Sequence, residues 1–238
     1  MQSPTCPVFI LAGGLGTRIR SLFSDRPKCL IPVLGKPFLE WQIERLAGQG
    51  FRTFVLCVSH LSEQIIDHFG GGAAWGIQVE YSIEAEPMGT AGALRCAAPF
   101  FQETALVLNG DTYLATDYRM LIAAHREQAP RGVIGSLGLA TVPDTGRYGQ
   151  VIIDGEYRIM AFREKTPSQS NTGLISAGAY VLEPSVLDYI PVGRPISIEQ
   201  ETFPAFVADR ALCGFSVDGA FVDMGTPEGY TMLETLLR

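Results

Sequence analysis

The residues with the clearest chemical character form a glycine-rich turn near the start of the chain. An apolar run at 9–12 leads into the turn, and the cations Arg18 and Lys28 follow it. The turn contains three glycines, Gly13, Gly14 and Gly16. Glycine adopts backbone conformations closed to other residues and lets N–H groups approach an anion closely. The pattern predicts a polyphosphate cradle, in which the two cations neutralise different phosphates. The alternative is a tight strand-to-helix turn with two solvated cations.

Two well-known phosphate-binding patterns do not fit this turn. A P-loop ends in Lys-Ser or Lys-Thr, whereas Gly16 is followed by Thr17 and Arg18. A dinucleotide-binding fingerprint needs a third glycine, and Ile19 stands where that glycine would be. The predicted phosphate-binding turn is therefore neither a P-loop nor a dinucleotide-binding loop.

Two acids follow apolar runs that read as strands. Asp111 comes after the run 105–108 and Asn109-Gly110, and Asp223 ends a short run just before Thr226. In open α/β sheets, ligands bind at the carboxyl ends of the strands. Mg²⁺ prefers oxygen ligands and often takes only one or two protein carboxylates beside phosphates and water. Asp111 and Asp223 are therefore predicted to share one Mg²⁺, although each acid taken alone could be an ordinary loop residue.

A triphosphate held by these groups could be attacked at the α or the γ phosphorus, and the residues alone do not say which. A sugar 1-phosphate is already ionised at neutral pH, so its attack on the α phosphorus would need no general base. The sequence offers no obvious pair of nucleophile and base. Positioning and charge neutralisation would then account for catalysis. A small-molecule kinase remains the alternative for γ transfer, but the chain lacks a P-loop and a clear base.

The elements that must position these residues alternate along the first half of the chain. Short apolar runs predict strands near 7–12, 53–58, 77–82, 104–109 and 132–139. Amphipathic stretches predict helices near 37–48, with Pro37 in the first turn, and near 61–69, 90–97 and 117–128. This alternation indicates βαβ units and a mainly parallel sheet covered on both faces.

The second half departs from this alternation. Two strands joined at Asp154-Gly155 predict an antiparallel addition, and its loops would grip a second substrate. A last helix is expected to start at Thr226-Pro227, because Thr caps and Pro favours the first turn.

Composition excludes several classes of protein. With 238 residues, of which 47% are hydrophobic, the chain can bury one sizeable core. A net charge of −7 argues against nucleic-acid and anionic-membrane partners. Five cysteines without a Cys-x-x-Cys pair suit reduced thiols in the cytoplasm, and the presence of only three histidines argues against a zinc site. No apolar run approaches the roughly 18 to 20 residues that span a bilayer, and no signal peptide is visible. A homodimer is left open.

Six segments in this order resemble the sugar-1-phosphate nucleotidyltransferases, the nucleotide-sugar pyrophosphorylases. They are Leu11–Arg18, Arg26–Lys28, Met88–Leu94, Asn109–Asp111, Glu164–Lys165 and Asp223–Pro227. The resemblance covers nearly the whole chain. It implies an α/β, three-layer Rossmann-like (GT-A-like) fold with a mostly parallel mixed central sheet and a small antiparallel sugar-binding addition. It also implies one domain over 1–238, with about 1–140 binding the nucleotide and about 141–238 binding the sugar and ending in the C-terminal helix.

Within this family, residues 24–40 look most like the D-glycero-D-manno-heptose 1-phosphate guanylyltransferases. The resemblance implies Mg²⁺-dependent transfer from GTP to the heptose 1-phosphate, giving GDP-heptose and pyrophosphate for surface glycan synthesis. The alternatives are mannose 1-phosphate with GTP, glucose 1-phosphate with dTTP or UTP, and N-acetylmuramate 1-phosphate with UTP. A catalytically silent nucleotide-sugar-binding regulator should have lost the arginine, the lysine or the acids, which are all present here.

The resemblance also implies roles for the matching residues. Lys28 would contact the phosphates around the α phosphorus, and Asp111 and Asp223 would bind the catalytic Mg²⁺. The triphosphate would be held by Gly13, Gly14, Gly16, Thr17 and Arg18, with Arg18 also stabilising the departing pyrophosphate. The rest of the nucleotide side would be formed, mostly through main-chain groups, by Leu11, Ala12, Pro87, Gly89, Thr90, Asn109 and Gly110.

The sugar side is implied in the same way. It would be formed by Asn109, Tyr148, Gly149, Glu164, Lys165, Ala177, Gly178 and Glu199. Glu164 would contact sugar hydroxyls and Lys165 the sugar phosphate, with Ala177 and Gly178 in a loop. Ser176 stands where several relatives carry Asn, so a mannose or glucose assignment does not transfer directly. For Glu199, an acid at a helix N-terminus is the equal alternative.

Overall fold

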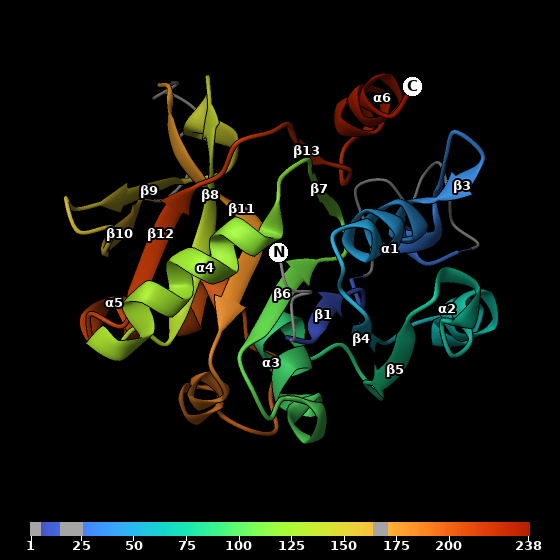
Figure 1. Ribbon diagram of the computed structural model, residues 1–238, viewed down its shortest axis with the longest axis horizontal. Helices are drawn as coiled ribbons and strands as arrows, with labels where there is room; N and C mark the ends of the chain where they lie inside the picture. The colour runs from blue at the N-terminus through green and yellow to red at the C-terminus, as the bar shows by residue number, and fades with distance from the viewer. Residues whose placement is uncertain (1–5, 15–25, 164–170) are drawn as a thin grey trace.

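A seven-stranded sheet forms the centre of the protein. The computed structural model describes residues 6–14, 26–163 and 171–238. In spatial order the strands are β12 (Leu212–Ser216), β8 (Gly135–Val142), β11 (Gly173–Leu182), β6 (Ala105–Asn109), β1 (Val8–Leu11), β4 (Thr53–Val58) and β5 (Gln78–Ile83), from left to right in Figure 1. β11 is antiparallel to both neighbours, and every other pair is parallel. The predicted mostly parallel, mixed sheet is confirmed.

Helices cover both faces of this sheet. On one face, α1 (Phe38–Gly48), α2 (Ser62–Phe69) and α4 (Tyr118–Gln128) pack in a cluster with Val8 and Ile10 of β1. On the other face, α3 (Gly89–Cys96) and α5 (Phe203–Ala208) pack in a cluster with Phe9. Successive residues of a strand point to opposite faces, so the central strands must be apolar throughout. Cys57 is fully buried in the second cluster, as its apolar surroundings predicted.

The start of α1 differs from the prediction. Pro37 lies in a short hairpin, β2 (Pro32–Val33) with β3 (Lys36–Pro37), whose turn uses positive φ angles at Leu34 and Gly35. Its ψ of 139° is extended, and the helix begins at Phe38. The expectation that Pro37 occupies the first helical turn was therefore wrong, because pairing with Pro32 holds it in the hairpin.

The second half carries the expected antiparallel hairpin. β9 (Gln150–Ile153) pairs with β10 (Ile159–Arg163), and the Asp154 carboxylate accepts the N–H groups of Glu156 and Arg158 in the connecting turn. A further antiparallel pair, β7 (Thr112–Leu114) with β13 (Phe221–Asp223), was not predicted. The division of the chain near residue 140 into nucleotide and sugar parts stays a prediction.

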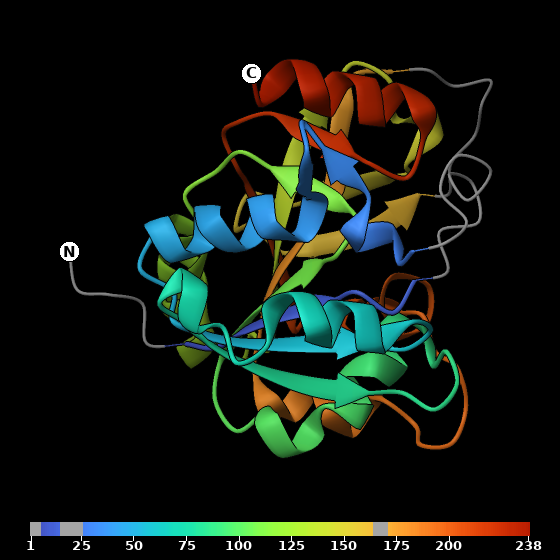
Figure 2. The same ribbon diagram turned by 90° about the vertical axis from the view of Figure 1, so that its right-hand side faces the viewer.

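The last helix begins where the sequence predicted. α6 (Pro227–Leu236) starts after Thr226, whose hydroxyl accepts the Gly229 N–H at 3.1 Å. Leu233 of α6 packs with Val33 of the hairpin and Val222 of β13, so three distant segments form one small cluster. Figure 2 shows the hairpin strands beside α6, the red helix.

Short helical turns complete the described chain. They are η1 (Lys28–Leu30), η2 (Ala73–Trp75), η3 (Ala98–Phe100), η4 (Ala129–Arg131), η5 (Thr145–Arg147), η6 (Pro184–Tyr189) and the π-helix η7 (Ile198–Thr202). Over the described ranges, no helix combines the length and apolar character needed to cross a membrane.

The order of the strands creates a crevice at one edge of the sheet. From β1 the chain passes to β4 and β5 on one side, and then crosses back to β6 on the other side of β1. At such a switch point the connections leave in opposite directions, so the carboxyl ends of the two strands border an open space. The segments Ala12–Gly14 and Gly110–Asp111 follow these two ends.

A buried network of polar side chains lies at the opposite edge of the sheet. His125 of α4 is fully buried, with Nδ1 2.8 Å from the Ser136 hydroxyl and Nε2 2.9 Å from the Glu183 carboxylate. Thr104 also donates to Glu183 at 2.8 Å. Burial lowers the pKa of His125, more than the nearby Glu183 carboxylate raises it, and Arg126 lowers it further. The imidazole is therefore neutral in the folded protein at pH 7.

This network predicts a loss of stability at mildly acidic pH. When the pH falls through about 6.5, the unfolded chain takes up a proton at His125 that the folded protein does not bind. We expect the free energy of unfolding to fall below that pH, by at most about 1.4 kcal/mol per pH unit from this group. His125→Gln should show a shallower decline in urea unfolding, whereas His60→Gln, at an exposed histidine, should behave like wild type. Equal pH profiles for His125→Gln and wild type would contradict this account.

Candidate active site

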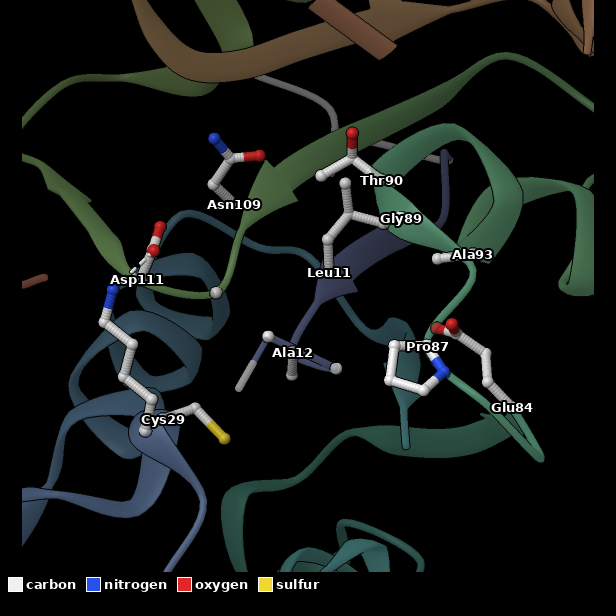
Figure 3. Close-up of a pocket in the computed structure, with 14 residues that line it drawn as sticks. Leu11, Ala12, Cys29, Glu84, Pro87, Gly89, Thr90, Ala93, Asn109 and Asp111 are labelled. Carbon is white, nitrogen blue, oxygen red and sulfur yellow. Dashed lines mark hydrogen bonds and ion pairs between the residues drawn. The ribbon is translucent and has the colours of Figure 1, made fainter. Parts of the chain in front are cut away.

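A pocket of about 230 Å³ opens at the switch point between β1 and β6 (Figure 3). All the nucleotide-side residues predicted within the described ranges line it: Leu11, Ala12, Gly13, Gly14, Pro87, Gly89, Thr90, Asn109 and Gly110. Lys28 and Asp111 line it too. Five predicted residues lie outside the described residues, namely Gly16, Thr17, Arg18, Glu164 and Lys165. The roles of all these residues stay predictions, but the structure brings most of them to one place.

The structure favours glycine at position 13 for a different reason than the sequence suggested, and a Cβ at Gly14 would meet nothing within 4 Å. Neither Gly13 nor Gly14 has a φ in the left-handed range, so special backbone conformations do not explain them. A Cβ on Gly13 would lie 3.2 Å from both the Glu84 carboxylate and the Ser59 hydroxyl, and that hydroxyl donates to the Gly13 carbonyl at 2.8 Å. Close packing between the turn after β1 and the ends of β4 and β5 is therefore what disfavours a side chain at Gly13.

The turn after β6 is fixed by two contacts. The Gly110 N–H donates to the Leu11 carbonyl at 3.0 Å, and a Cβ on Gly110 would lie 2.7 Å from that oxygen. From the other side, the buried amide of Gln42 in α1 donates to the carbonyls of Asn109 and Thr112, at 3.1 and 2.7 Å. These bonds hold the backbone on both sides of Gly110 and Asp111, so Asp111 projects from a constrained turn.

The ionic side of the pocket contains Lys28 and Asp111, and Asp223 lies next to Asp111, outside the residues that line the pocket. The Lys28 ammonium, from η1, lies 2.6 Å from the Asp111 carboxylate, and only 10% of the Lys28 side chain is exposed. Asp223 of β13 lies opposite Thr112 of β7, and the Met224 N–H donates to the Asp111 carbonyl at 2.9 Å. The β7–β13 pairing thus brings the two predicted metal-binding acids to the same end of neighbouring strands.

The carboxylates on this side fit a divalent cation that takes most of its ligands from phosphate and water oxygens rather than from the protein. Within 6–14, 26–163 and 171–238, no cluster of three or more His, Cys, Asp and Glu side chains could enclose a metal. Mg²⁺ commonly takes one or two protein carboxylates and completes its shell with phosphate and water oxygens. Asp111 and Asp223 could supply the two carboxylates. Among the described residues, the Lys28 ammonium lies against Asp111 and balances its charge.

The opposite side of the pocket is more apolar and contains an acid that the sequence analysis missed. Pro87 and Ala93 lie there, and Figure 3 places Glu84 beside Pro87, across the pocket from Asp111. Glu84 directly follows β5 and is 6% exposed, and its carboxylate accepts the Met88 N–H at 2.8 Å. Burial raises the pKa of Glu84, which this hydrogen bond only partly offsets. Its place directly after a strand was the available signal, since Asp111 was also predicted from its position just beyond a strand.

The amino end of α3 joins this pocket to the segment 196–199. Gly89 has a φ of +71°, and a Cβ there would lie 2.5 Å from the Ile196 carbonyl oxygen. Ala91 donates its N–H to the same carbonyl at 2.9 Å, and the Thr90 hydroxyl accepts the Ile198 N–H at 2.8 Å. The predicted base side and the predicted sugar side therefore share one wall.

On the predicted sugar side, two hydroxyl groups meet at Glu199. Its carboxylate accepts the hydroxyls of Ser176 and Tyr180, at 2.9 and 2.8 Å. Burial and the Glu199 carboxylate raise the pKa of Tyr180 well above its usual value, so the phenol stays a donor. The Oδ1 atom of Asn109 is buried and has no hydrogen-bond partner among the described residues. Asn109 and Glu199 thus supply acceptor atoms on this side.

The segment Ala177-Gly178 is not the loop that was expected. It lies within β11, at a bulge where the register with β8 shifts between Ser176 and Tyr180. Gly178 has a φ of +65°, and a Cβ there would lie 2.8 Å from the Asn109 amide nitrogen. The bulge lets the backbone pass close to Asn109, and the Ala177 side chain is fully buried in the core cluster that contains β1 and α1.

Tyr148 and Gly149 lie toward β13. The Tyr148 ring packs edge-on against Phe221, with 5.4 Å between the centroids, two residues before Asp223. Gly149 has a φ of +83° and donates its N–H to Thr145 at 3.0 Å. These two residues are therefore placed beside the ionic side of the pocket.

Comparison with known proteins agrees with this geometry. Residues 8–237 match the family described as nucleotidyl transferase. The mannose-1-phosphate guanylyltransferase of Mycobacterium tuberculosis is 39% identical, over 93% of this chain and 61% of the relative, so this chain spans less than two thirds of that protein. The D-glycero-alpha-D-manno-heptose 1-phosphate guanylyltransferase of Campylobacter jejuni is 37% identical, over 93% of this chain and 95% of the relative.

A solved structure is similar over the same extent. The crystal structure of HddC from Yersinia pseudotuberculosis superposes with a TM-score of 0.85 at 31% identity, and covers 98% of this chain and 100% of that one. The same protein is also solved complexed with GMP-PN.

The backbone at Gly89 predicts a large effect of one methyl group. Gly89→Ala would force a side chain into a left-handed conformation and against the Ile196 carbonyl. We expect a loss of about 1–3 kcal/mol in the free energy of unfolding, measured by urea denaturation. Gly48→Ala is the matched control, because nothing lies within 4 Å of a Cβ there, and it should leave stability equal or slightly higher. A Gly89→Ala protein as stable as wild type would show that the wall at Ile196 is not rigid.

The Lys28–Asp111 ion pair predicts competition between the ammonium group and a metal ion. Lys28→Met removes the cation that faces Asp111, so Mn²⁺ should bind the nucleotide-free protein more tightly, by roughly 3- to 10-fold. Electron paramagnetic resonance of free Mn²⁺ measures this directly. Lys36→Met, which breaks the exposed pair with Glu44, should not change Mn²⁺ affinity. Equal or weaker binding to Lys28→Met would contradict the competition.

Proposed function

Because this chain belongs to the nucleotidyl transferase family, we propose that it is a sugar-1-phosphate nucleotidyltransferase. In the form that we favour, it transfers a guanylyl group from GTP to D-glycero-D-manno-heptose 1-phosphate, with Mg²⁺, and yields GDP-heptose and pyrophosphate. The product would feed surface glycan synthesis. The cytoplasmic location expected from the cysteines stays a prediction, as does a homodimer.

The main support for this proposal is that the pocket has two chemically different sides. The pocket at the switch point has an ionic side, with Lys28 paired to Asp111 and Asp223 next to them, and an apolar side around Pro87 and Ala93. Such a division suits a molecule that is a polyphosphate at one end and a flat base at the other. The Asn109–Glu199 acceptors beyond the shared wall at 196–198 would then face the sugar.

The proposed reaction needs positioning and charge neutralisation rather than acid–base chemistry. A phosphate oxygen of the sugar 1-phosphate attacks the α phosphorus in line, the bond to the bridging oxygen breaks, and pyrophosphate leaves. The attacking group is already ionised, so no side chain has to remove a proton. Lys28 would neutralise charge near the α phosphorus. Asp111 and Asp223 would hold Mg²⁺, which supplies further neutralisation of the phosphates.

The choice of guanine and heptose rests on relatives. The Campylobacter jejuni relative named for this heptose aligns over nearly all of both proteins. A second candidate is favoured by a specific observation: the 39% identical Mycobacterium tuberculosis relative is named for mannose 1-phosphate. Both candidates use GTP. On the predicted sugar side, Ser176 donates to Glu199 at 2.9 Å, and this contact does not by itself choose between the two sugars.

A catalytically silent nucleotide-sugar regulator is the rival from another class. Such a protein would not need charged groups for turnover. Lys28 and Asp111 line one end of the pocket and Asp223 lies next to them, which favours an enzyme.

The substrates can be identified by pyrophosphate release. The purified chain is assayed with a grid of nucleoside triphosphates and sugar 1-phosphates, with Mg²⁺ and with EDTA. Release confined to GTP with the heptose 1-phosphate is the expected result, and release with GTP and mannose 1-phosphate would select the second candidate. If no pair gives Mg²⁺-dependent release, the enzymatic proposal fails.

Substitution of the two acids tests the proposed metal site. Asp111→Asn and Asp223→Asn remove a charge with little change in shape, and each should reduce kcat by at least about 100-fold. Thermal unfolding should show that both variants fold. Asp67→Asn, at an exposed acid of α2, is the control and should keep full activity. Near-wild-type activity of both site variants in Mg²⁺ would rule out the two-carboxylate account.

A further inference from the structure

Gln42 of α1 is a buried amide that lies behind the pocket rather than in its lining. The side chain is 5% exposed. Its Nε2 group donates to the carbonyls of Asn109 and Thr112, at 3.1 and 2.7 Å. These two carbonyls stand on either side of Gly110 and Asp111. One side-chain amide therefore spans the turn from which Asp111 projects.

The orientation of the Gln42 amide is fixed, and it leaves the amide oxygen unpaired. The Oε1 atom is buried and has no hydrogen-bond partner among the described residues. Turning the amide over would place this oxygen against two carbonyl oxygens, so both N–H groups must face the turn. A buried acceptor without a partner lowers stability. Methionine would fill a similar volume without that cost, so stability alone does not account for glutamine at this position.

The turn that Gln42 spans carries both predicted metal-binding acids. Asp111 lies between the two carbonyls that the amide holds. Thr112 is the partner of Asp223 in the β7–β13 pair, and the Met224 N–H donates to the Asp111 carbonyl at 2.9 Å. A shift of this turn would therefore move both carboxylates.

Helix α1 also leads back to Lys28, the other member of the ion pair. The Ile31 N–H donates to the Lys28 carbonyl at 3.1 Å, and the N–H of Phe38, the first residue of α1, donates to the Ile31 carbonyl at 3.0 Å. The helix is thus joined to η1 through its first residue and to the Asp111 turn through Gln42. It connects the two backbones whose side chains meet at 2.6 Å.

We propose that Gln42 is a positioning residue for the reaction. Its amide holds the turn that carries Asp111, and through Thr112 also Asp223, in the orientation that metal binding and turnover need. This inference rests on the proposed function and deepens it, because it assigns the placement of the charged groups to a side chain that touches no substrate. Catalysis by charge neutralisation depends on such fixed geometry, so a small displacement of the turn costs rate.

Gln49, on the same face of α1, offers a matched comparison. Its Nε2 group donates to the Thr116 carbonyl at 2.7 Å, and its Oε1 atom accepts the Tyr118 N–H at 2.9 Å. Both contacts lie past β7, and Arg45 also donates to the Thr116 carbonyl, at 2.9 Å. Gln49 therefore fastens α1 to the same segment with two hydrogen bonds, as Gln42 does, but away from the Asp111 turn.

The experiment compares Gln42→Met with Gln49→Met in the full-length chain. Both variants should fold, with thermal midpoints lowered by roughly 2 to 4 °C. Gln42→Met should lower kcat for pyrophosphate release by roughly 10- to 100-fold. The KM for the nucleoside triphosphate should stay within about 3-fold of wild type.

Metal binding gives a readout that does not depend on turnover. Mn²⁺ should bind nucleotide-free Gln42→Met roughly 10-fold more weakly than wild type, measured by electron paramagnetic resonance of free Mn²⁺. Gln49→Met should keep the wild-type kcat and Mn²⁺ affinity. If Gln42→Met does not fold, Gln42→Asn takes its place with the same expectations, because its amide is one methylene too short to reach both carbonyls.

Wild-type kcat and Mn²⁺ affinity in the Gln42 variant would overturn the inference and leave the proposed function intact. Equal losses in the Gln42 and Gln49 variants would also overturn it, because they would show that α1 acts only as a general support. If wild type turns over no pair of substrates, the proposed function fails and Mn²⁺ binding decides this inference. A loss of affinity confined to the Gln42 variant would then support it, and an unchanged affinity would overturn it.

Discussion

The contact between the carboxyl ends of β1 and β6 is the constraint on which the rest of the structure depends. The Gly110 N–H bonds the Leu11 carbonyl, and the space between them admits no Cβ. Gln42 holds the same turn from α1 through the carbonyls of Asn109 and Thr112. The chain on either side of Gly110 therefore leaves in a fixed direction. Asn109 is directed to the bulge at Gly178, and Asp111 to Lys28.

From this turn the pocket acquires two chemically different sides. The ionic side depends on the β7–β13 pair, which places Asp223 beside the Asp111 turn although the two are far apart in the chain. The apolar side depends on Glu84 at the end of β5 and on the unusual backbone at Gly89. The wall at 196–198 links the apolar side to Glu199. A rigid pocket of this kind suits a reaction that relies on orientation and charge neutralisation.

Much of the fold follows from sequence periodicity. The predicted strand at 53–58 is β4 to the residue, and the helices α1 to α4 lie within one residue of prediction at each end, because their apolar spacing is strong. Pairing between strands that are far apart in the chain could not be predicted from periodicity. The three-residue strands β7 and β13 have little periodicity, and only tertiary packing reveals their contact. The bulge at Ser176–Tyr180 and the hairpin at Pro32–Pro37 were not predicted for the same reason. Glu84 lay in no recognised motif, and its burial is visible only in three dimensions.

The central claim is transfer at the α phosphorus, and the fate of isotopic label tests it most directly. The protein is incubated with Mg²⁺, a sugar 1-phosphate and GTP labelled either at the α or at the γ phosphorus. The account predicts that α label appears in the nucleotide sugar and γ label in pyrophosphate. Transfer of γ label to the sugar would contradict the account, because it would show that the pocket performs kinase chemistry.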